Sequence, residues 1–480
     1  MLFRMLAGSR ARAAGTVAAG IAALLLLASS AAAAPPASEV RFAAPSLFPK
    51  YSPGVRDYVV RCHDGPVTVD GHASGGWRLA IGNQTFRSGD FSRTVPMRAG
   101  KAFTATAKSG PDVYRYHVRC LPDAFPTYTF HRSGPVSPGY FAATHDFSPL
   151  ASQYGMIFDE HGVPIWWIHT PIWNPRVLPS GKMLWVDDSP SSGEWGIHRL
   201  DGSLVRTLNP VGVPANAHDL QILPNGDYLT GATIKRSHVD TSAYGGSSDA
   251  DVLNTELQQV SAAGGLVWDW NSQDHFSLAE TGHRWPWAIN HGYDIEHWNS
   301  IQPNGSTVIA SFRNLDAVYK INKATGKIVW KLGGTKTKKS LVPKQDPHAY
   351  TLGSQHDARL LPDGTLTVFD NRTNLGSDSV PEAVRFRINQ ERGWATLLDR
   401  ITDPDVPKSN CCGSARRLAN GDWLIAWGQQ NPIGGYKPDG TRTFLLSFNG
   451  NYTYRAEPVP WGAVTAADLR QGMDAMSAGP

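Results

Sequence analysis

The 480-residue sequence has few charged residues and almost no excess of one sign. Charged residues make up 18% of it, and the formal net charge is +4. Arg4, Arg10 and Arg12 lie in the first 34 residues without an acidic neighbour, which leaves a net charge of +1 for the rest of the chain. A nearly neutral chain excludes a partner held by bulk charge, such as nucleic acid.

Long apolar runs and helical periodicity are also scarce. No stretch of about 18 apolar residues follows the N-terminal region, so no later membrane span is expected. No segment of useful length repeats its apolar residues every 3.6 positions or so, which excludes a solenoid of helix pairs. Aromatic and turn-forming residues are abundant instead, with 16 Trp, 15 Tyr, 17 Phe, 47 Gly and 34 Pro. Together with 41% hydrophobic residues, this composition predicts an all-β protein with many short strands and tight turns.

Residues 1–34 are typical of an export signal. Three arginines precede an apolar stretch from Thr16 to Ser30, and the small residues Ala31 to Ala34 offer a cleavage site before Pro35. A membrane anchor is the alternative, but a stretch composed mostly of alanine is too weakly apolar to hold a bilayer well. We therefore expect signal cleavage and a secreted or periplasmic protein, in an oxidising compartment where disulfides persist.

Only four cysteines are present, at Cys62, Cys120, Cys411 and Cys412, and they allow three pairings. Cys62 and Cys120 end two similar strand-like segments, so a bridge between them would staple one small β-domain. Cys411 and Cys412 are adjacent, which permits either a vicinal disulfide or two thiols. Neither pair has the spacing that tetrahedral zinc ligation normally uses.

Two short turn units alternate along the chain. The first is an apolar residue followed by a Pro-x-Gly-like turn and a strand, and the second is a glycine turn before an apolar run that often ends in Trp. The first unit begins at Leu178, Leu223, Pro303, Leu361 and Leu418, and the glycines of the second are Gly162, Gly202, Gly265, Gly326, Gly393 and Gly450. Two turns and about four strands per repeat are typical of a β-propeller blade.

Six copies of the second unit predict a six-bladed β-propeller over residues 127–480. Residues 35–126, which precede the repeats, fit a small N-terminal β-sandwich domain. A seventh, degenerate blade is the alternative, because residues 237–250 and 272–290 form long polar insertions.

Three histidines share one position in the repeat. His218, His297 and His356 each stand six residues before the proline of the first unit. Because the inner strands of a propeller line its central channel, residues just ahead of them should gather at one mouth of it. Arg313 follows the strand at 307–312 and should lie at its far end or in the next turn, and the alternative is a plain surface position.

The residue types at this mouth favour an anionic substrate over a metal ion. Catalytic zinc sites with three imidazoles usually draw two ligands from one element, whereas these histidines come from different repeats. Arg313 nearby would also place a cation beside a dication. Imidazoles and a guanidinium together suit an anion whose oxygens need several donors, so no metal site is expected.

At these segments the chain resembles the bacterial arylsulfotransferases that use aryl sulfates, and not a nucleotide, as the sulfuryl donor. The segments begin at His218-Asp-Leu-Gln, Asp294-Ile-Glu-His-Trp-Asn-Ser-Ile, Ala310-Ser-Phe-Arg-Asn, Thr325-Gly-Lys-Ile-Val-Trp and Gln355-His-Asp-Ala-Arg. The resemblance spans roughly residues 130–455 and implies a six-bladed propeller with an N-terminal β-sandwich. It also implies an aryl-sulfate sulfotransferase that needs no cofactor.

The resemblance assigns roles residue by residue. His356 matches the histidine that becomes transiently sulfated. His218, His297 and Arg313 match residues that bind the sulfuryl group or move protons, and Asn299 matches the asparagine of the His-x-Asn motif. The partners implied are an aryl sulfate and a phenol, which react in turn by a ping-pong mechanism.

Other features leave further interpretations open. Trp285 and Trp287, in an aromatic-rich insertion, would either stack on an aryl or sugar substrate or pack under their own loop. The same histidines and Arg313 would also suit a propeller lyase or hydrolase acting on an acidic polysaccharide, with Tyr293 as the acid. The segment at Thr325 resembles the repeat of quinoprotein dehydrogenases too, whose cofactor lies beside a vicinal disulfide. A non-enzymatic binding propeller is the last alternative.

Overall fold

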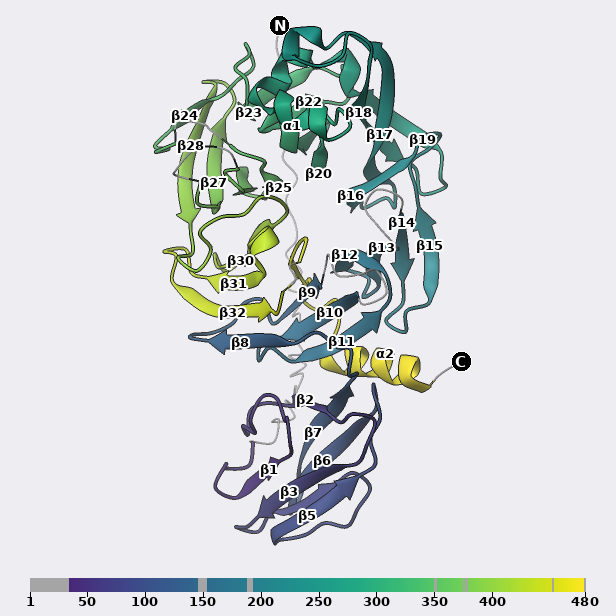
Figure 1. The fold of residues 1–480 in the computed structure, drawn as a ribbon. Helices are drawn as coiled ribbons and strands as arrows, with labels where there is room; N and C mark the ends of the chain where they lie inside the picture. The colour runs from purple at the N-terminus through teal and green to yellow at the C-terminus, as the bar shows by residue number, and fades with distance from the viewer. Residues whose placement is uncertain are drawn as a thin grey trace, which may run out of the picture.

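The computed structural model describes residues 34–145, 153–187, 193–348, 352–373, 375, 379–450 and 453–478. The expected export signal, residues 1–34, lies outside this part of the chain except for its last residue. The described residues are mostly β-structure and form eight sheets. Figure 1 shows two of them at one end of the molecule and six arranged in a ring. The prediction of a β-rich chain built from repeated sheets is therefore confirmed.

The two sheets at the end of the molecule lie beneath the ring and share one core. Their strands are β1 (Val40–Ala43), β3 (Val67–Ala73) and β5 (Gly89–Val95) in one sheet, and β2 (Asp57–Arg61), β7 (Asp112–Leu121), β6 (Ala102–Ser109) and β4 (Arg78–Ile81) in the other. Side chains of β3 alternate between buried and exposed, as expected for a sheet with one face on a core. A disulfide joins Cys62 to Cys120 within this core.

The six sheets of the ring follow one another along the chain, and each turns one edge strand towards the centre of the ring (Figure 1). The first three sheets are β33 (Glu457–Pro458), β9 (Tyr140–Thr144), β10 (Tyr154–Asp159) and β11 (Pro164–His169); β12 (Ile172–Val177), β13 (Met183–Asp187), β14 (Glu194–His198) and β15 (Leu204–Leu208); and β16 (Ala215–Ile222), β17 (Tyr228–Val239), β18 (Ala250–Val260) and β19 (Leu266–Asn271).

The last three sheets are β20 (Trp298–Asn304), β21 (Thr307–Phe312), β22 (Ala317–Asn322) and β23 (Ile328–Gly333); β25 (His356–Leu360), β26 (Thr365–Asp370), β27 (Glu382–Asn389), β28 (Trp394–Ile401) and β24 (Val342–Lys344); and β29 (Ser414–Arg417), β30 (Trp423–Ala426), β31 (Pro432–Tyr436), β32 (Arg442–Phe448) and β8 (Tyr128–Arg132). Within the described ranges the ring contains no seventh sheet. The polar insertions lengthen the β17–β18 hairpin and form short helices instead.

Two pairings between distant segments close the ring. β8, from the start of the ring, adds to the outer edge of the last sheet by pairing with β32. β33, from near the C-terminus, adds to the inner edge of the first sheet by pairing with β9. Each end of the ring thus contributes a strand to the sheet formed by the other end, and these pairings join the first and last sheets.

The repeated turns explain the repeated sheets. In the first unit, Gly226 adopts a positive φ of 85° in the hairpin between β16 and β17. In the second unit, Gly326 has a φ of 68° between β22 and β23. Glycine reaches this left-handed region without steric cost, so both turns are set by local sequence.

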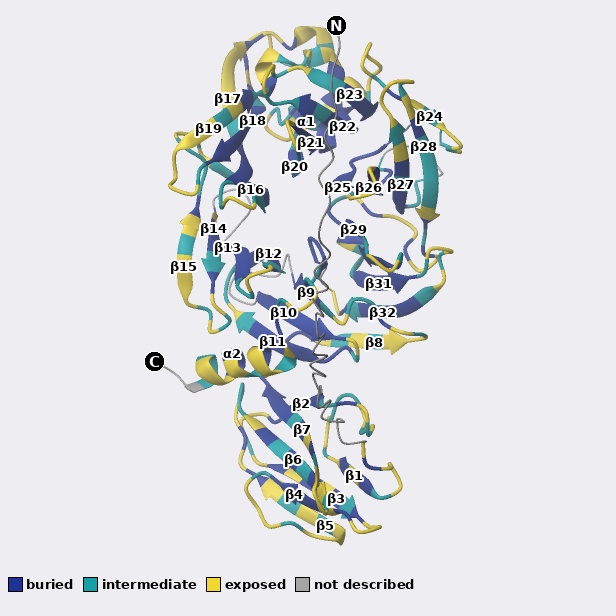
Figure 2. Cartoon of the chain, turned by 180° about the vertical axis from the view of Figure 1, so that it is seen from behind, coloured by how far each residue is buried: buried dark blue, intermediate teal, exposed yellow. Residues whose placement is uncertain are grey.

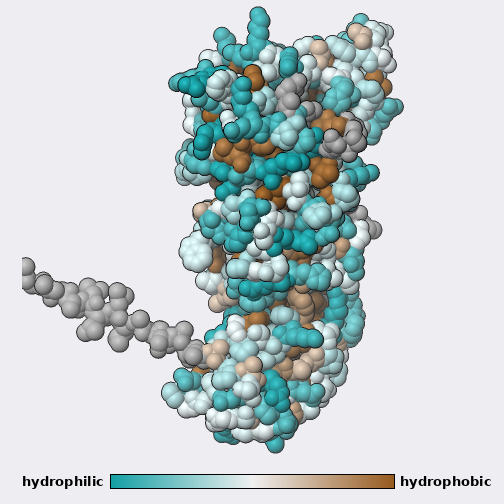
Figure 3. All heavy atoms as spheres, turned by 90° about the vertical axis from the view of Figure 1, so that its left-hand side faces the viewer, coloured by the Kyte–Doolittle hydropathy of each residue, from teal (hydrophilic) through white to brown (hydrophobic). Residues whose placement is uncertain are grey.

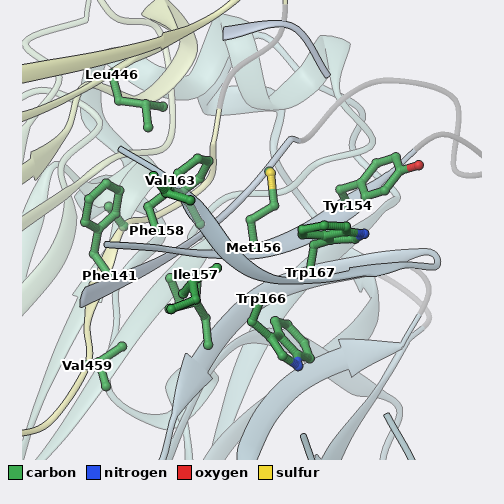
Figure 4. Close-up of a cluster of buried hydrophobic side chains, with 14 of the residues drawn as sticks. Phe141, Tyr154, Met156, Ile157, Phe158, Val163, Trp166, Trp167, Leu446 and Val459 are labelled. Carbon is green, nitrogen blue, oxygen red and sulfur yellow. The ribbon is translucent and has the colours of Figure 1, made fainter. Parts of the chain in front are cut away.

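Packing between neighbouring sheets buries both faces of the middle strands. Every residue of β10, β21 and β26 is buried, whereas exposed residues concentrate on outer strands such as β15 (Figure 2). Figure 4 shows one such core, where Phe141, Met156, Phe158 and Trp167 of the first sheet lie together. On the face seen in Figure 3, hydrophobic residues form separate patches among hydrophilic ones.

The C-terminal segment is not part of a sheet. It forms helix α2 (Ala466–Ala478), which the absence of long apolar periodicity in the sequence did not predict. Leu469 and Met473 pack into the core of the first ring sheet, and Arg470 forms an ion pair with Asp57 of β2 at 2.6 Å. Thr465 and Asp468 bond reciprocally to each other's backbone N–H groups, which is the local signal for this helix start.

Short helices complete the chain. They are the 3₁₀-helices η2 (Ser242–Tyr244), η3 (Ser272–Asp274), η4 (Leu278–Arg284), η5 (Arg313–Leu315) and η6 (Gly428–Gln430), and helix α1 (Trp285–Asn290). Among the residues described, none of the helices is long and apolar enough to span a membrane.

Candidate functional site

The three histidines of the repeat come from neighbouring sheets and lie together. The rings of His218, in β16, and His297, just before β20, have centroids 5.0 Å apart. The ring of Tyr454 lies 6.0 Å from His218 and 6.2 Å from His356, the first residue of β25. The structure therefore brings all three imidazoles to one place around Tyr454.

Irregular pairing in the inner strands points these side chains out of their sheets. β16 loses its register with β17 between Asn216 and Gln221, and β25 loses its register with β26 directly after His356. His297 has a positive φ of 49°, which a regular strand does not contain. Bulges of this kind redirect side chains next to active sites, which explains why a shared sequence offset becomes a shared location.

His356 is held as a neutral imidazole with a lone pair on Nε2. Its Nδ1 lies 2.8 Å from the carbonyl oxygen of Ser354 and 2.8 Å from Oδ1 of Asn371, so Nδ1 carries the proton and donates it. The backbone N–H of Cys412 donates to Nε2 at 3.2 Å. Burial, and next the positive charge of Arg313, hold the pKa of His356 well below its ordinary value. A neutral imidazole with an unprotonated Nε2 is a competent nucleophile.

Arg313 is buried, and none of the described carboxylates lies within ion-pair distance of it. It lies in η5 at 8% exposure, so a plain surface position is excluded. Its guanidinium donates to Oδ1 of Asn314 at 2.7 Å and to the carbonyl oxygen of Asn410 at 3.2 Å, and the described residues form no ion pair with it. Burial, and next the charge of Arg284, lower its pKa to about 10, so it stays charged at neutral pH. A buried cation without a counter-ion is suited to binding an anionic ligand.

The other two histidines differ in their surroundings. Nδ1 of His297 lies 2.6 Å from Oδ2 of Asp294, and 27% of the His297 side chain is exposed. Nδ1 of His218 bonds instead to the neutral side chain of Asn216. Burial, and next the neighbouring His297, lower the pKa of His218 well below its ordinary value. His297 is therefore bonded to a carboxylate and partly exposed, which suits it to proton transfer, whereas the lowered pKa of His218 keeps that residue neutral.

Asn299 occupies a supporting position. Its side chain is fully buried and donates from Nδ2 to the carbonyl oxygen of Gln355 at 2.8 Å. Gln355 in turn donates to three oxygen atoms of the neighbouring sheet. Asn299 therefore fixes the backbone that precedes His356, and the structure does not turn its amide nitrogen towards the imidazoles.

The predicted aromatic residues separate into two groups. Trp285 is 3% exposed and stacks on Tyr244 at 4.6 Å, which is the expected packing under its own loop. Trp287, in α1, is half-buried and lies 4.8 Å from the Arg313 guanidinium carbon, so it borders the site. The hydroxyl of Tyr293 accepts a hydrogen bond from the backbone N–H of Ser247 at 3.0 Å, on the β17–β18 loop, and does not contact the imidazoles.

A buried ionic network supports the histidines from below. Asp219 and Asp357, each directly after a site histidine, pair with Arg359 at 2.8 and 2.9 Å and with Arg455 at 3.3 and 3.6 Å. Burial opposes ionisation of Asp219, yet Arg359, Arg455 and Arg176 hold its pKa below its ordinary value. The two carboxylates also accept backbone N–H groups of the next sheets, and this ties the inner strands together.

Sequence reasoning missed Tyr454, Arg455 and Asn371. Tyr454 and Arg455 follow the last repeat, and Asn371 follows β26, so none of them shares the histidine offset. The pairing of Asp294 with His297 could have been predicted from the sequence, because Asp294 stands only three residues before the histidine. Among the described residues, no group of three or more His, Cys, Asp and Glu side chains has the geometry of a metal site.

Comparison with known proteins supplies the family. The family model of the arylsulfotransferases (ASST) matches residues 206–449, which hold all three histidines and Arg313. No curated protein shows significant sequence similarity to the chain. Similar solved structures include a Bacteroides caccae protein of unknown function at 12% identity, covering 68% of this chain and 100% of that protein with a TM-score of 0.42. Another is virginiamycin B lyase from Staphylococcus aureus at 11% identity, covering 71% and 91% with a TM-score of 0.34.

Likenesses this distant do not bear on function, whereas the family match covers half of the chain and the residues of the site. It confirms the resemblance noted in the sequence. The chain belongs to the arylsulfotransferase (ASST) family, and this membership implies an aryl-sulfate sulfotransferase.

Proposed function

We propose that the protein transfers a sulfuryl group from an aryl sulfate to a phenol by a ping-pong reaction through a sulfohistidine at His356. The observation that carries this proposal is the pairing of a neutral His356, unprotonated at Nε2, with the buried Arg313, which has no carboxylate partner in the described structure. One group supplies the nucleophile, and the other supplies charge for the sulfuryl oxygens.

In the donor half-reaction, the lone pair of Nε2 of His356 attacks sulfur. The N–S bond forms as the bond from sulfur to the aryl oxygen breaks, and the electron pair leaves with the phenolate. As in phosphoryl transfer, charge spreads over the peripheral oxygens, so positioning and electrostatic stabilisation provide most of the catalysis. Arg313 binds these oxygens, while the Nδ1 proton of His356 stays with Asn371 and Ser354.

His297 protonates the leaving phenolate. The Asp294 carboxylate holds its Nδ1, which leaves Nε2 to exchange a proton with the phenol oxygen, whereas the lowered pKa of His218 makes that residue a poor proton donor at neutral pH. In the acceptor half-reaction, His297 takes the proton of the incoming phenol as its oxygen attacks the sulfur of the sulfohistidine. Neutral His218, whose ring lies 5.0 Å from that of His297, borders the position of the phenol.

Trp287 contacts the aryl group in this proposal, because its half-buried ring lies beside Arg313. Trp285 and Tyr293 act only through packing, since the indole N–H of Trp285 donates to the carbonyl oxygen of Leu278 and the hydroxyl of Tyr293 accepts from the N–H of Ser247. No metal or other cofactor takes part in these steps.

We also propose that the ring is a six-bladed propeller domain over residues 127–480, with a sandwich domain over 35–126 and a signal peptide over 1–34. The Cys62–Cys120 disulfide is consistent with export to an oxidising compartment. Fractionation of the producing cells and N-terminal sequencing test this, and the expected mature protein is extracytoplasmic and begins near Pro35.

Incubation with 4-nitrophenyl sulfate and phenol tests the activity. The expected result is nitrophenol release that depends on the acceptor, and a sulfuryl adduct on the intact protein when the acceptor is left out. His356→Ala should abolish both, while the control His131→Ala, at an exposed position of β8, should leave both unchanged. Full activity without His356, or unsaturated uronate released from an acidic polysaccharide, would contradict the proposal.

A further inference from the structure

The segment 409–413 contacts three groups of the proposed sulfuryl site, namely His356, Arg313 and Asn371. The carbonyl oxygen of Asn410 accepts from Arg313 at 3.2 Å, and the N–H of Cys412 donates to Nε2 of His356 at 3.2 Å. The carbonyl oxygen of Cys412 accepts from the side chain of Asn371 at 3.1 Å. One short stretch of backbone thus sets the positions of the nucleophile, the cation and the residue that holds the Nδ1 proton.

A disulfide between Cys411 and Cys412 constrains this segment. Cys412 has a φ of 67°, in the left-handed region that residues with a side chain rarely adopt. The neighbouring Gly413 has a φ of 100°, and its N–H donates to the carbonyl oxygen of Tyr454 at 2.9 Å. Residues in such conformations persist when their surroundings hold them there, and here a covalent bridge does so.

The Cys412 amide also stands where charge develops during the reaction. At rest it donates to Nε2 of His356, which is possible only while Nε2 is unprotonated. When Nε2 bonds to sulfur it loses its lone pair, and the sulfuryl oxygens, one bond beyond sulfur, become the nearest acceptors. A backbone N–H aimed at developing negative charge is the usual means of stabilising such oxygens.

We propose that the Cys412 backbone amide is a catalytic group that passes from Nε2 of His356 to a sulfuryl oxygen as the N–S bond forms, and that the Cys411–Cys412 disulfide positions it. This inference rests on the proposed function. The disulfide itself is not consumed, and no electrons enter or leave the transfer. The amide has two tasks, to keep His356 in the tautomer protonated at Nδ1 and to stabilise the transferred group.

Opening one disulfide at a time tests the proposal. A water-soluble phosphine reduces each disulfide to two thiols and becomes its oxide, with water as the source of the oxygen. It opens both bridges in the wild type but only Cys62–Cys120 in Cys411→Ala/Cys412→Ala, and only Cys411–Cys412 in Cys62→Ala/Cys120→Ala. Alkylation followed by mass measurement counts the thiols, and the partly exposed Cys411 gives the reagent access.

Loss of the Cys411–Cys412 bridge by either route should lower kcat at least tenfold, with KM for the aryl sulfate changed less than threefold. The sulfohistidine formed without acceptor should also hydrolyse faster. Cys62→Ala/Cys120→Ala without reductant should keep wild-type kcat, because that bridge lies in the distant sandwich. If this control does not fold, wild type and Cys411→Ala/Cys412→Ala, each with and without reductant, separate the two bridges equally well.

A readout that needs no activity separates this inference from the proposed function. ¹⁵N NMR of labelled histidine, with His356→Gln for assignment, should show the oxidised protein protonated at Nδ1 of His356 and the reduced protein with Nε2 protonated in part. An inactive wild type would refute the proposed function. The tautomer of His356 would still show whether the Cys411–Cys412 disulfide positions the Cys412 amide. An unchanged tautomer after the bridge opens, or kcat within twofold of wild type, would overturn the inference.

Discussion

Replacement of Arg313 by Met should abolish most activity without loss of stability. A unit charge 4 Å from a sulfuryl oxygen contributes about 4 kcal/mol at an effective dielectric constant of about 20. Since each 1.4 kcal/mol or so is a factor of ten, kcat/KM should fall by about 10²–10³. The kcat/KM of Arg313→Lys should lie between those of the wild type and Arg313→Met, because lysine keeps the charge but loses the planar fork that reaches both Asn314 and Asn410.

Stability should respond differently. Met loses two hydrogen bonds, at about 1 kcal/mol each, but it also removes the desolvation cost of a buried charge, which is several kcal/mol. The free energy of unfolding should therefore stay equal to the wild-type value or rise. The pKa of His356 should also rise, because the charge of Arg313 is the main cause of its depression after burial. The acidic limb of kcat/KM should move to higher pH.

Steady-state assays with 4-nitrophenyl sulfate from pH 4 to 9, together with urea unfolding, measure both effects. Arg236→Met, at an exposed position of β17, is the matched control and should change neither. A loss of less than tenfold in Arg313→Met would refute the electrostatic role. A fall of more than about 2 kcal/mol in unfolding free energy would show that Arg313 supports the fold, since removal of a buried group that only stabilises structure has costs of this size.

Three further outcomes are expected. His297→Gln and Asp294→Asn should slow turnover of phenyl sulfate far more than that of 4-nitrophenyl sulfate, whose less basic leaving group needs no acid; equal loss on both donors would contradict a general acid at His297. Burial raises the pKa of Asp370 to about 8 from its ordinary value of 3.8. Between these two pH values the Asp370 carboxyl is protonated in the folded state but ionised in the unfolded state. The free energy of unfolding should therefore fall by up to about 1.4 kcal/mol per pH unit as the pH rises through this range. Asp370→Asn should flatten that slope in urea unfolding at several pH values, and an unchanged slope would assign it to other groups. Leu469→Ala should cost about 2–5 kcal/mol of unfolding free energy, because the fully buried Leu469 fastens α2 to the first ring sheet; a cost below 1 kcal/mol would show that α2 is dispensable.

Local sequence was enough to predict the repeated sheets. Glycine at positions such as Gly226 and Gly326 permits a left-handed turn, and the strands between the turns are short and apolar. The three histidines that share one position in the repeat also lie together in the structure, because equal positions in equivalent inner strands lie at the same end of the ring. Helix α2 was missed, although Thr465 and Asp468 form a local capping pair, because it is a single helix outside the repeat.

Side-chain roles in the site were harder to predict. Arg313 is buried because α1 and the segment before β29 both pack against it, at Trp287 and Asn410. Asn299 matched the asparagine of the family's His-x-Asn motif, yet its amide nitrogen bonds to the backbone before His356. Both outcomes depend on contacts between segments that are remote in the chain, which no local pattern records.

The sequence by itself determined the β-rich repeat, the family and the common position of the three histidines, because each depends on residues close together in the chain. Only the tertiary structure decided the chemical state of those histidines. Asn371 and Cys412, which adjoin two different sheets, set the proton position on His356. Nδ1 of His297 bonds to a carboxylate, that of Asp294, whereas Nδ1 of His218 bonds to the neutral amide of Asn216. The reason is physical: burial and neighbouring charges shift a pKa, and folding alone brings those neighbours within a few ångströms.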